Sequence, residues 1–313
     1  MTKQKNKFSK TMPIWLILTG ITGLVLIITL MLQGKDVALF DPKGLIALEQ
    51  HRLMIRSVII MLEIAIPTLT VFFFVAWKYR ESNTKAKHDP HHKTDKSTVF
   101  LIWSLPFITM VLLASMMWPA THKLAPQKSI QNGIEPMTVQ VVAMRWKWLF
   151  IYPEQKIASV NFLQIPVGTP VQFDITADES PMSSFWIPHL GGQLYAMTGH
   201  VNRLNLIADT AGDFNGASAE INGKGFAGMK FIARASTNDE FNAWVEEVKQ
   251  SQNPLDTAEY KKLLAPSEYN PQAFYSIAGQ DIYDNILMKY MGSHAQNTEQ
   301  KYGTNDGHNT ENE

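Results

Sequence analysis

Two long apolar runs near the start of the chain limit its fold more than any other feature of the sequence. The first extends from about Leu53 to Trp77 and the second from Val99 to Trp118. A helix rises about 1.5 Å per residue, so each run is long enough to cross a hydrocarbon layer about 30 Å thick. We therefore predict transmembrane helices at residues 53–77 and 99–118.

The loop between these runs, residues 78–98, indicates how they are oriented. From Lys78 to Lys96 it carries six Lys or Arg side chains against three acids. Short loops rich in Lys and Arg stay on the cytoplasmic side of a membrane. We expect this loop in the cytoplasm and everything after Trp118 on the outer side.

A further apolar run, from about Ile14 to Leu32, follows lysines at positions 3, 5, 7 and 10. A basic start followed by an apolar stretch is typical of an export signal. Residues 1–32 are therefore a signal peptide or a signal-anchor helix, and both alternatives stay open. No clear small-residue cleavage site follows, which favours the anchor. Residues 33–52 would then form a short outer-side segment.

From Thr138 onward the pattern changes to short segments rich in β-branched and aromatic residues, bounded by Gly, Pro, Asn and Asp. Repeated segments of this kind predict an all-β sandwich or Greek-key barrel. We assign residues 119–236 to this outer domain. The pattern alone does not separate a cupredoxin-like fold from an immunoglobulin-like one.

The end of the chain reads as helical and then polar. Thr237 and Glu240 have the spacing of a capping box, which predicts a helix to about Gln250. Two more short helices are expected, so residues 237–292 form a helical arm. Residues 293–313 are polar and are predicted to be a disordered tail.

Composition excludes several kinds of function. The chain has 28 basic and 28 acidic residues, so nothing indicates a nucleic-acid partner. It contains no Cys, which excludes disulfides, thiolate metal sites and thiol nucleophiles together. No nucleophile–base pair or phosphate-binding loop is visible in the sequence.

Five motifs carry a resemblance to a known family: DPKG at 41–44, AWKYR at 76–80, WKWLFIYPEQ at 146–155, SFWIP at 184–188 and GFAGMKF at 225–231. Together they resemble subunit II of the haem–copper respiratory oxidases, within the cytochrome bo-type, quinol-oxidising branch. The resemblance implies a membrane α-helical hairpin, an all-β cupredoxin-like Greek-key domain and a C-terminal helical arm.

The copper-bearing branch of that family holds a dinuclear copper centre with one His, a Cys-x-Glu-x-Cys loop, a second His and a Met. The resemblance places these six ligand positions at Ser183, Ser218, Glu220, Asn222, Phe226 and Met229. Two copper ions that share an electron need bridging thiolates and imidazoles, and a hydroxyl, an amide and a phenyl ring do not replace them. We therefore expect no copper site here and no electron transfer from cytochrome c.

The resemblance implies a non-catalytic subunit II of a proton-pumping ubiquinol oxidase in a bacterial inner membrane, with its C-terminal domain in the periplasm. The haems, the remaining copper and ubiquinol would bind subunit I, and this chain would bind no cofactor. Its partners would be subunit I, the other oxidase subunits and the lipid bilayer. The alternative is a free-standing, membrane-anchored binding or sensor module.

Three residues of the membrane half are candidates for proton handling or subunit contact. Glu63 lies inside the first span, where a carboxylate facing lipid is unfavourable. It is a proton-handling group, an anchor for a partner helix, an acid near a helix end, or a neutral hydrogen-bonded acid. Relatives carry a proton-path acid near the start of the next span, and the matching position here is Thr98. Asp95, about one turn earlier, is either its substitute or a solvated acid.

Other polar and aromatic residues have less specific patterns. Trp146, Trp148, Phe150 and Tyr152 alternate as a packed strand requires, and we predict packing and docking on subunit I. Glu220 either faces a partner subunit or an ion at the interface, or is a polar loop residue.

Four histidines are also possible ligands by residue type. His189 is predicted to be an interface or surface residue, because its position is not a ligand position of the family. His88, His91 and His92 are predicted to belong to a solvated basic loop rather than to a metal site, because no Cys or carboxylate completes a recognisable ligand spacing.

Overall fold

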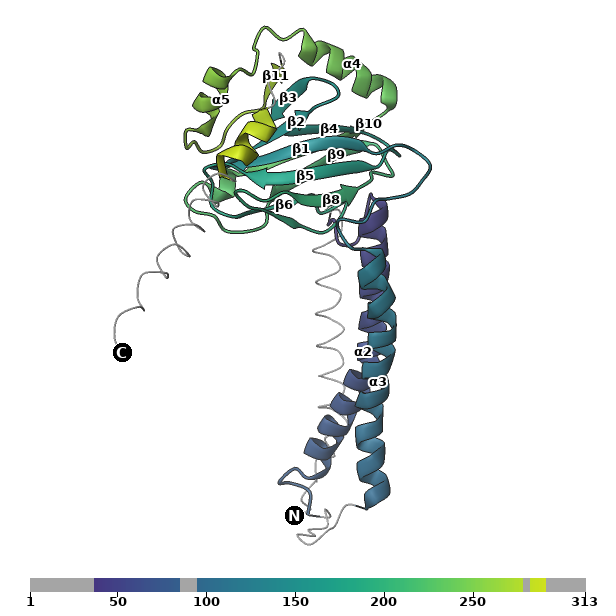
Figure 1. Ribbon diagram of the computed structural model, residues 1–313. Coiled ribbons are helices and arrows are strands. Elements are labelled where there is room, and N and C mark those ends of the chain that lie inside the picture. The colour runs from purple at the N-terminus through teal and green to yellow at the C-terminus, as the bar shows by residue number, and fades with distance from the viewer. Residues whose placement is uncertain (1–36, 85–94, 278–281, 291–313) are drawn as a thin grey trace, which may run out of the picture. The chain divides into compact units, whose positions relative to one another are not determined.

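The computed structural model describes residues 37–84, 95–277 and 282–290 (Figure 1). The expectations for residues 1–32, for His88, His91 and His92, and for the tail 293–313 lie outside the described residues. The chain divides into two compact units, Met1–Asp41 and Pro42–Glu313. Of the first unit only residues 37–41, which form a turn and a bend, are described. All further description concerns the second unit.

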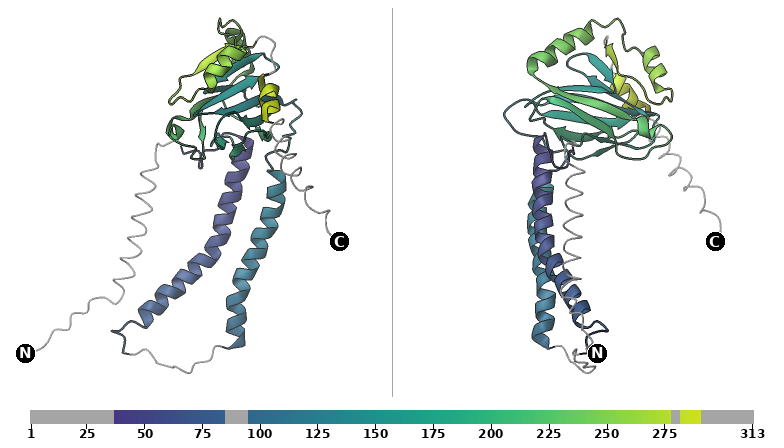
Figure 2. Two further views of the ribbon diagram at one scale, coloured as in Figure 1. Left: turned by 60° about the vertical axis from the view of Figure 1, so that its left-hand side comes forward. Right: turned by 180° about the vertical axis from the view of Figure 1, so that it is seen from behind.

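Both expected spans are helices that are long and apolar enough to cross a membrane. Helix α2 extends over Leu45–Lys78 and α3 over Lys96–Lys123, so each is longer than the apolar run within it. Most of their side chains are exposed within this chain, as expected for surfaces that face lipid or other subunits. Pro67 lies inside α2, and the α2 ribbon is bent rather than straight in Figure 2.

Eleven strands form two sheets in the described part of the chain. The first sheet has the order β11-β3-β2-β1-β5-β8, with β11 at Ala273–Ser276, β3 at Ile157–Val160, β2 at Lys147–Tyr152, β1 at Met137–Met144, β5 at Val171–Ala177 and β8 at Asn202–Leu206. The second has the order β4-β10-β9-β6-β7, with β4 at Phe162–Pro166, β10 at Lys230–Ser236, β9 at Gly212–Ser218, β6 at Ser183–Trp186 and β7 at Leu194–Ala196. Two pairs, β1–β5 and β4–β10, are parallel and the other strand pairs are antiparallel. The expected cupredoxin-like sandwich is confirmed.

The core between the two sheets is aromatic. Phe185 and Phe231 stack with ring centroids 5.2 Å apart, and Trp148 meets both rings edge-on. Gly216 is required beside them, because a Cβ at this position would lie 2.1 Å from the Phe231 ring. These contacts join β2, β6, β9 and β10 into one packed unit.

The C-terminal arm adds one strand to the edge of the first sheet, and it packs both against the core between the sheets and on the other face of the first sheet. It consists of α4 (Asn238–Lys249), α5 (Thr257–Leu264), β11 and a helix over residues 282–290 (Figure 1). The capping box at Thr237 and Glu240 is confirmed at the start of α4. Tyr260 and Tyr275 of the arm pack in a second core with Met144 and Leu149. Both faces of β2 and of the second half of β1 are therefore buried, and these segments lack the alternation of one-sided sheets.

Candidate functional site

The six positions that the family resemblance assigns to copper ligands come from β6, the end of β9 and the loop that leads through the short 3-10 helix η1 (Phe226–Gly228). Strand β6 pairs with β9, with Phe185 opposite Ser218, so the two segments are held side by side. The backbone N–H of Ser218 donates to the carbonyl of Met229 at 3.1 Å. The fold thus brings the loop's two ends together beside Ser183.

Asn222 is the centre of a hydrogen-bonded group at this place. Its Nδ2 donates to the Ser183 Oγ at 2.7 Å and to the Met229 Sδ at 3.1 Å. The Ser218 Oγ donates to the Glu220 carbonyl at 3.1 Å. The thioether of Met229 therefore accepts a hydrogen bond from an amide, and the group has no formal charge.

Burial divides the six positions into two sets. Ser183, Ser218, Asn222 and Met229 are buried, with Met229 fully enclosed. Glu220 and Phe226 are half-buried, and the neighbouring Ile221 is 78% exposed. Within the described residues the Asn222 Oδ1 is buried and has no hydrogen-bond partner, which costs about 1–3 kcal/mol. The buried set forms an interior group, whereas Ile221 presents an apolar side chain at the surface.

Trp146 holds the loop from the side. Its Nε1 donates to the Asn222 carbonyl at 3.3 Å. Its ring lies so close to the loop backbone that a Cβ at Gly225 would come within 2.4 Å of it. Trp146 occupies the tight turn between β1 and β2 with a φ of 66°, so the predicted aromatic strand begins only after it, at Lys147.

The docking interpretation of the aromatic run is wrong for three of its four members. Trp148, Phe150 and Tyr152 are fully buried in the domain's own core, so they have no surface to offer a partner. The Tyr152 hydroxyl donates to the Gln164 carbonyl at 3.0 Å. Their predicted packing role stands, while Trp146 alone is half-buried.

His189 was expected at an interface or on the surface, and this placement is wrong within the chain itself. The residue is 5% exposed and its ring lies 5.4 Å from the Phe214 ring. Its carbonyl accepts a hydrogen bond from the Lys43 N–H at 2.8 Å, just before α2 begins. The family's ligand positions, on which that prediction rested, gave no indication of this burial.

Asp95 and Thr98 lie together at the start of α3. Asp95 is the N-cap, and its carboxylate accepts a hydrogen bond from the Thr98 N–H at 3.2 Å. Hydrogen bonds from the Thr98 side chain and backbone hold the pKa of Asp95 below its usual range. The pair begins the helix, and the carboxylate is exposed.

A cluster of polar side chains around Asp178 lies between the sandwich and the arm, and no pattern in the sequence predicts it. The Asp178 carboxylate is buried and accepts hydrogen bonds from the Tyr260 and Tyr290 hydroxyls, each at 2.6 Å. It also accepts one from the Lys289 Nζ at 2.9 Å. Burial and the hydrogen bond to Asp178 raise the pKa of Tyr260 well above its usual value. The partners lie about a hundred positions apart, so no local spacing could reveal them.

A second buried charged group, Lys147, also binds the arm, but as a hydrogen-bond donor where Asp178 is an acceptor. Lys147 of β2 donates from its Nζ to the carbonyls of Leu263 and Ala265 at 2.8 and 3.0 Å. These carbonyls end α5, where helix geometry leaves carbonyls without partners. Burial lowers the pKa of Lys147. Lys147 and Asp178 together attach the arm to the sandwich through polar groups.

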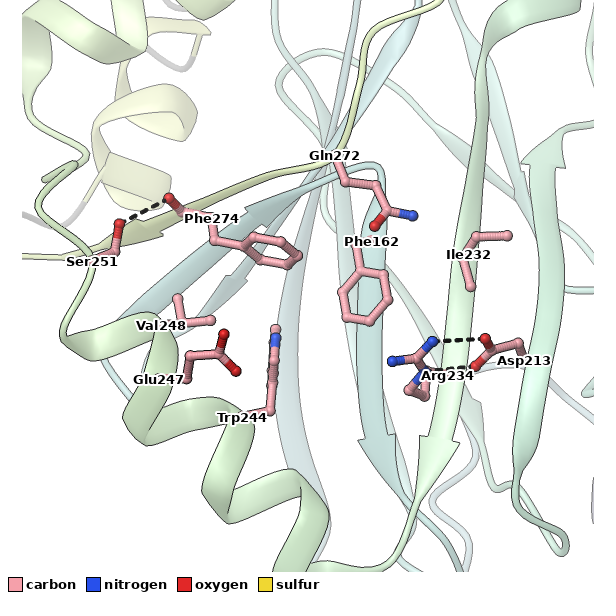
Figure 3. A pocket seen from close by; sticks show the side chains of 10 residues that line it. All are labelled: Phe162, Asp213, Ile232, Arg234, Trp244, Glu247, Val248, Ser251, Gln272 and Phe274. Carbon is pink, nitrogen blue, oxygen red and sulfur yellow. Dashed lines mark hydrogen bonds and ion pairs between the residues drawn. The ribbon is translucent and has the colours of Figure 1, made fainter.

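Figure 3 shows a pocket of about 530 Å³ where α4 meets β4, β10 and β11. Phe162, Trp244 and Phe274 line one part of it. On the other side, Arg234 donates two hydrogen bonds to Asp213, at 2.7 and 2.8 Å. The two charges of this ion pair thus compensate each other. The described residues that line the pocket include no nucleophile–base pair. Among the described residues, no group of three or more His, Cys, Asp or Glu could hold a metal ion.

Two family models match the chain. Residues 154–236 match the periplasmic domain of cytochrome c oxidase subunit II, and residues 249–294 match the COX aromatic rich motif. The first covers most of the sandwich, and the second covers the arm from the end of α4 onward.

Curated relatives match over most of their length. The chain is 44% identical to cytochrome bo(3) ubiquinol oxidase subunit 2 of Pseudomonas putida, over 84% of this chain and 83% of that protein. It is 43% identical to ubiquinol oxidase subunit 2 of Acetobacter aceti, over 83% and 85%. Among solved structures, it is similar to the periplasmic domain of cytochrome oxidase subunit II (CoxB) of Bradyrhizobium japonicum, with 24% identity and a TM-score of 0.35, over 38% and 96%.

Proposed function

This chain belongs to the subunit 2 family of the cytochrome bo(3)-type ubiquinol oxidases, and we propose that it is a non-catalytic subunit that supports assembly and stability of subunit I. It is a subunit of a quinol oxidase complex in the inner membrane, with two membrane spans and a periplasmic domain. In the proposal, ubiquinol, the haems and the remaining copper bind subunit I. Electrons then pass from quinol to oxygen without crossing this chain.

The hydrogen bonds of Asn222 are the observation that carries the proposal. A dinuclear copper centre needs bridging thiolates and imidazoles. Ser183, Ser218, Asn222 and Phe226 supply hydroxyls, an amide and a phenyl ring, so these residues do not fit the metal. The side-chain amide of Asn222 also donates a hydrogen bond to the Met229 sulfur, so that sulfur is already engaged inside the domain.

The attachment of the arm supports a structural role. Lys147 and Asp178 place charged groups inside the domain, and each has several hydrogen-bond partners on the arm. Removing one partner of a buried charge destabilises a protein by about 3–5 kcal/mol, so such groups hold one arrangement strongly. A rigid periplasmic domain above two spans is suited to stabilising a larger membrane subunit.

The test is purification of the intact complex through a tag on the C-terminal end of this chain. We expect haem in the eluate, oxygen uptake with a ubiquinol analogue and none with reduced cytochrome c. Copper analysis of the chain after its separation from the other subunits should give none. A stable, haem-free single chain that is inactive with both donors would contradict the proposal and favour the free-standing module.

A further inference from the structure

The pocket drawn in Figure 3 lies on the outer face of the second sheet, at the place where the arm meets it. On β10 the side chains of Phe231 and Ala233 are buried in the core between the sheets. Ile232 and Arg234 alternate with them, so they lie on the other face and line the pocket. Helix α4 and strand β11 supply the opposite wall, and we call the space the α4 pocket. Its volume of about 530 Å³ is that of a small-molecule site.

Three aromatic rings form one wall of the α4 pocket. The ring centroid of Phe162 lies 5.8 Å from that of Trp244 and 5.4 Å from that of Phe274, and the Trp244 and Phe274 centroids are 6.3 Å apart. Figure 3 shows the Phe162 ring face-on and the Trp244 ring edge-on at the centre of the pocket. Because the face of an aromatic ring carries partial negative charge, this wall attracts cations as well as apolar groups.

One cation of the chain already lies against this wall. The Arg234 Cζ is 5.3 Å from the centroid of the Phe162 ring, over its face. Two hydrogen bonds to Asp213 hold the guanidinium in this position. These bonds also keep the pKa of Asp213 below its usual range, so both partners are ionised at neutral pH and compensate each other. The ion pair therefore adds no net charge to the pocket.

Glu247 gives the pocket its negative charge. It lines the pocket from α4, three residues after Trp244, and in Figure 3 its carboxylate points toward the Trp244 ring. Among the described residues, none forms a hydrogen bond or an ion pair with this side chain. The neighbouring Glu246, in contrast, pairs with Lys249 at 2.8 Å and does not line the pocket.

The lining favours an organic cation over other kinds of ligand. Arg234 is already engaged by Asp213, so the pocket has no unpaired positive side chain for an anion. The other oxygen donors of the lining side chains are the Glu247 carboxylate, the Gln272 amide and the Ser251 hydroxyl, which are too few for the oxygen shell of a calcium ion. A cation with apolar substituents satisfies the rings and the carboxylate together.

We propose that the α4 pocket binds a small organic cation, with its charge beside Glu247 and its alkyl groups against Trp244 and Phe274. A quaternary ammonium group fits this lining well, because its surface is apolar while its charge interacts with ring faces. The pocket belongs to the sandwich and the arm, so such a solute reaches it from the periplasm. The inference goes beyond the proposed function and does not rest on it.

The experiment measures binding to the full-length chain in a non-ionic detergent that contains neither ammonium groups nor sugars. The chain has no Cys, so Gln250→Cys provides a single attachment site for a trifluoromethyl label. Gln250 is exposed and directly precedes Ser251 of the pocket lining. Fluorine NMR follows titrations with choline, with neohexyl alcohol and with N-acetylglucosamine. Neohexyl alcohol has the shape of choline, but a carbon replaces the charged nitrogen.

We expect choline to shift the fluorine signal in a saturable way, with a dissociation constant of about 1 mM. Neohexyl alcohol should bind roughly tenfold more weakly, because it lacks the charge. Glu247→Gln should weaken choline binding about fivefold and leave the binding of the alcohol unchanged, since it removes the charge and keeps the size of the side chain. The matched control Glu246→Gln removes the adjacent charge on α4 and should change the affinity for choline by less than about twofold.

Equal affinities for choline and neohexyl alcohol would overturn the inference, as would equal losses in Glu247→Gln and Glu246→Gln. Tighter binding of N-acetylglucosamine than of choline would also overturn it and indicate a sugar site. Both substituted glutamates are exposed, so the two variants are expected to fold. Haem content and oxygen uptake of the complex test the proposed function separately, and a haem-free chain that binds choline would contradict that function alone.

Discussion

Asn222 joins several segments of the fold through the hydrogen bonds of one side chain and its carbonyl. Its amide bonds to Ser183 and Met229, and its carbonyl accepts from Trp146, so it connects four segments of the fold. These hydrogen bonds hold the loop in place beside Ser183 and Met229. This arrangement leads to a prediction about the residues alone.

Restoring the four missing ligand types should create a copper site. We predict that the combined variant Ser183→His, Ser218→Cys, Asn222→Cys and Phe226→His binds two copper ions per chain, with intense visible absorption from thiolate-to-copper charge transfer. The Asn222 Nδ2 lies 2.7 Å from the Ser183 Oγ and 3.1 Å from the Met229 Sδ. The new side chains would therefore be close enough to bind the same pair of copper ions.

The matched control omits Asn222→Cys, since one thiolate cannot form the double bridge. Copper content and the visible spectrum are measured for both variants after dialysis. Equal copper binding by the two variants would contradict the assignment of these positions.

At the scale of elements, the arm is attached by groups whose titration affects its docking. Burial raises the pKa of Tyr260, Tyr283 and Tyr290, and in two of them the hydrogen bond to Asp178 adds to the effect. A group with a raised folded-state pKa stabilises the fold fully below its unfolded pKa, here about 10, and loses that contribution as pH rises further. We predict that the arm loosens progressively above about pH 10.

Hydrogen exchange of residues 257–290 and tyrosinate absorbance, followed from pH 8 to 12, measure this loosening. Tyr290→Phe removes one hydroxyl from the Asp178 cluster and should cost about 1–2 kcal/mol of stability at neutral pH. Arm amides that exchange at the same protected level on both sides of pH 10 would count against the mechanism.

The sequence predicted elements better than it predicted their partners. Thr237 and Glu240 lie three positions apart, so their reciprocal capping could be predicted from local spacing. The turn at Trp146 could not, because an aromatic residue with a φ of 66° is rare and is held here by contacts with Gly223 and Gly225. The burial of His189 likewise depends on the distant residue Phe214.

The candidate site shows the same division. Family motifs located Ser183 and Met229 in the sequence, but only the fold shows that Asn222 connects them. The Asp178 cluster depends on Tyr260, Lys289 and Tyr290. These residues are far from Asp178 in the sequence and meet it only in the folded protein. Local patterns report periodicity and caps, whereas long-range polar pairing depends on the complete fold.

At the scale of the whole molecule, two spans with a basic loop between them place Ser82 and Thr210 on opposite sides of the membrane. Ser82 follows α2, whereas Thr210 lies in the sandwich beyond α3, and both are exposed. The chain contains no Cys, so a single introduced Cys is a unique label. We predict that a membrane-impermeant maleimide added to spheroplasts labels Thr210→Cys and leaves Ser82→Cys unlabelled.

After the membrane is permeabilised, both variants should react to a similar extent, because both side chains are exposed. The basic loop explains the direction: carrying its Lys and Arg residues across the membrane is unfavourable, whereas the nearly neutral outer domain crosses readily. Labelling of Ser82→Cys in intact spheroplasts, with Thr210→Cys protected, would reverse the orientation. It would also place the sandwich, the Asn222 group and the arm in the cytoplasm, where a periplasmic role for this subunit is impossible.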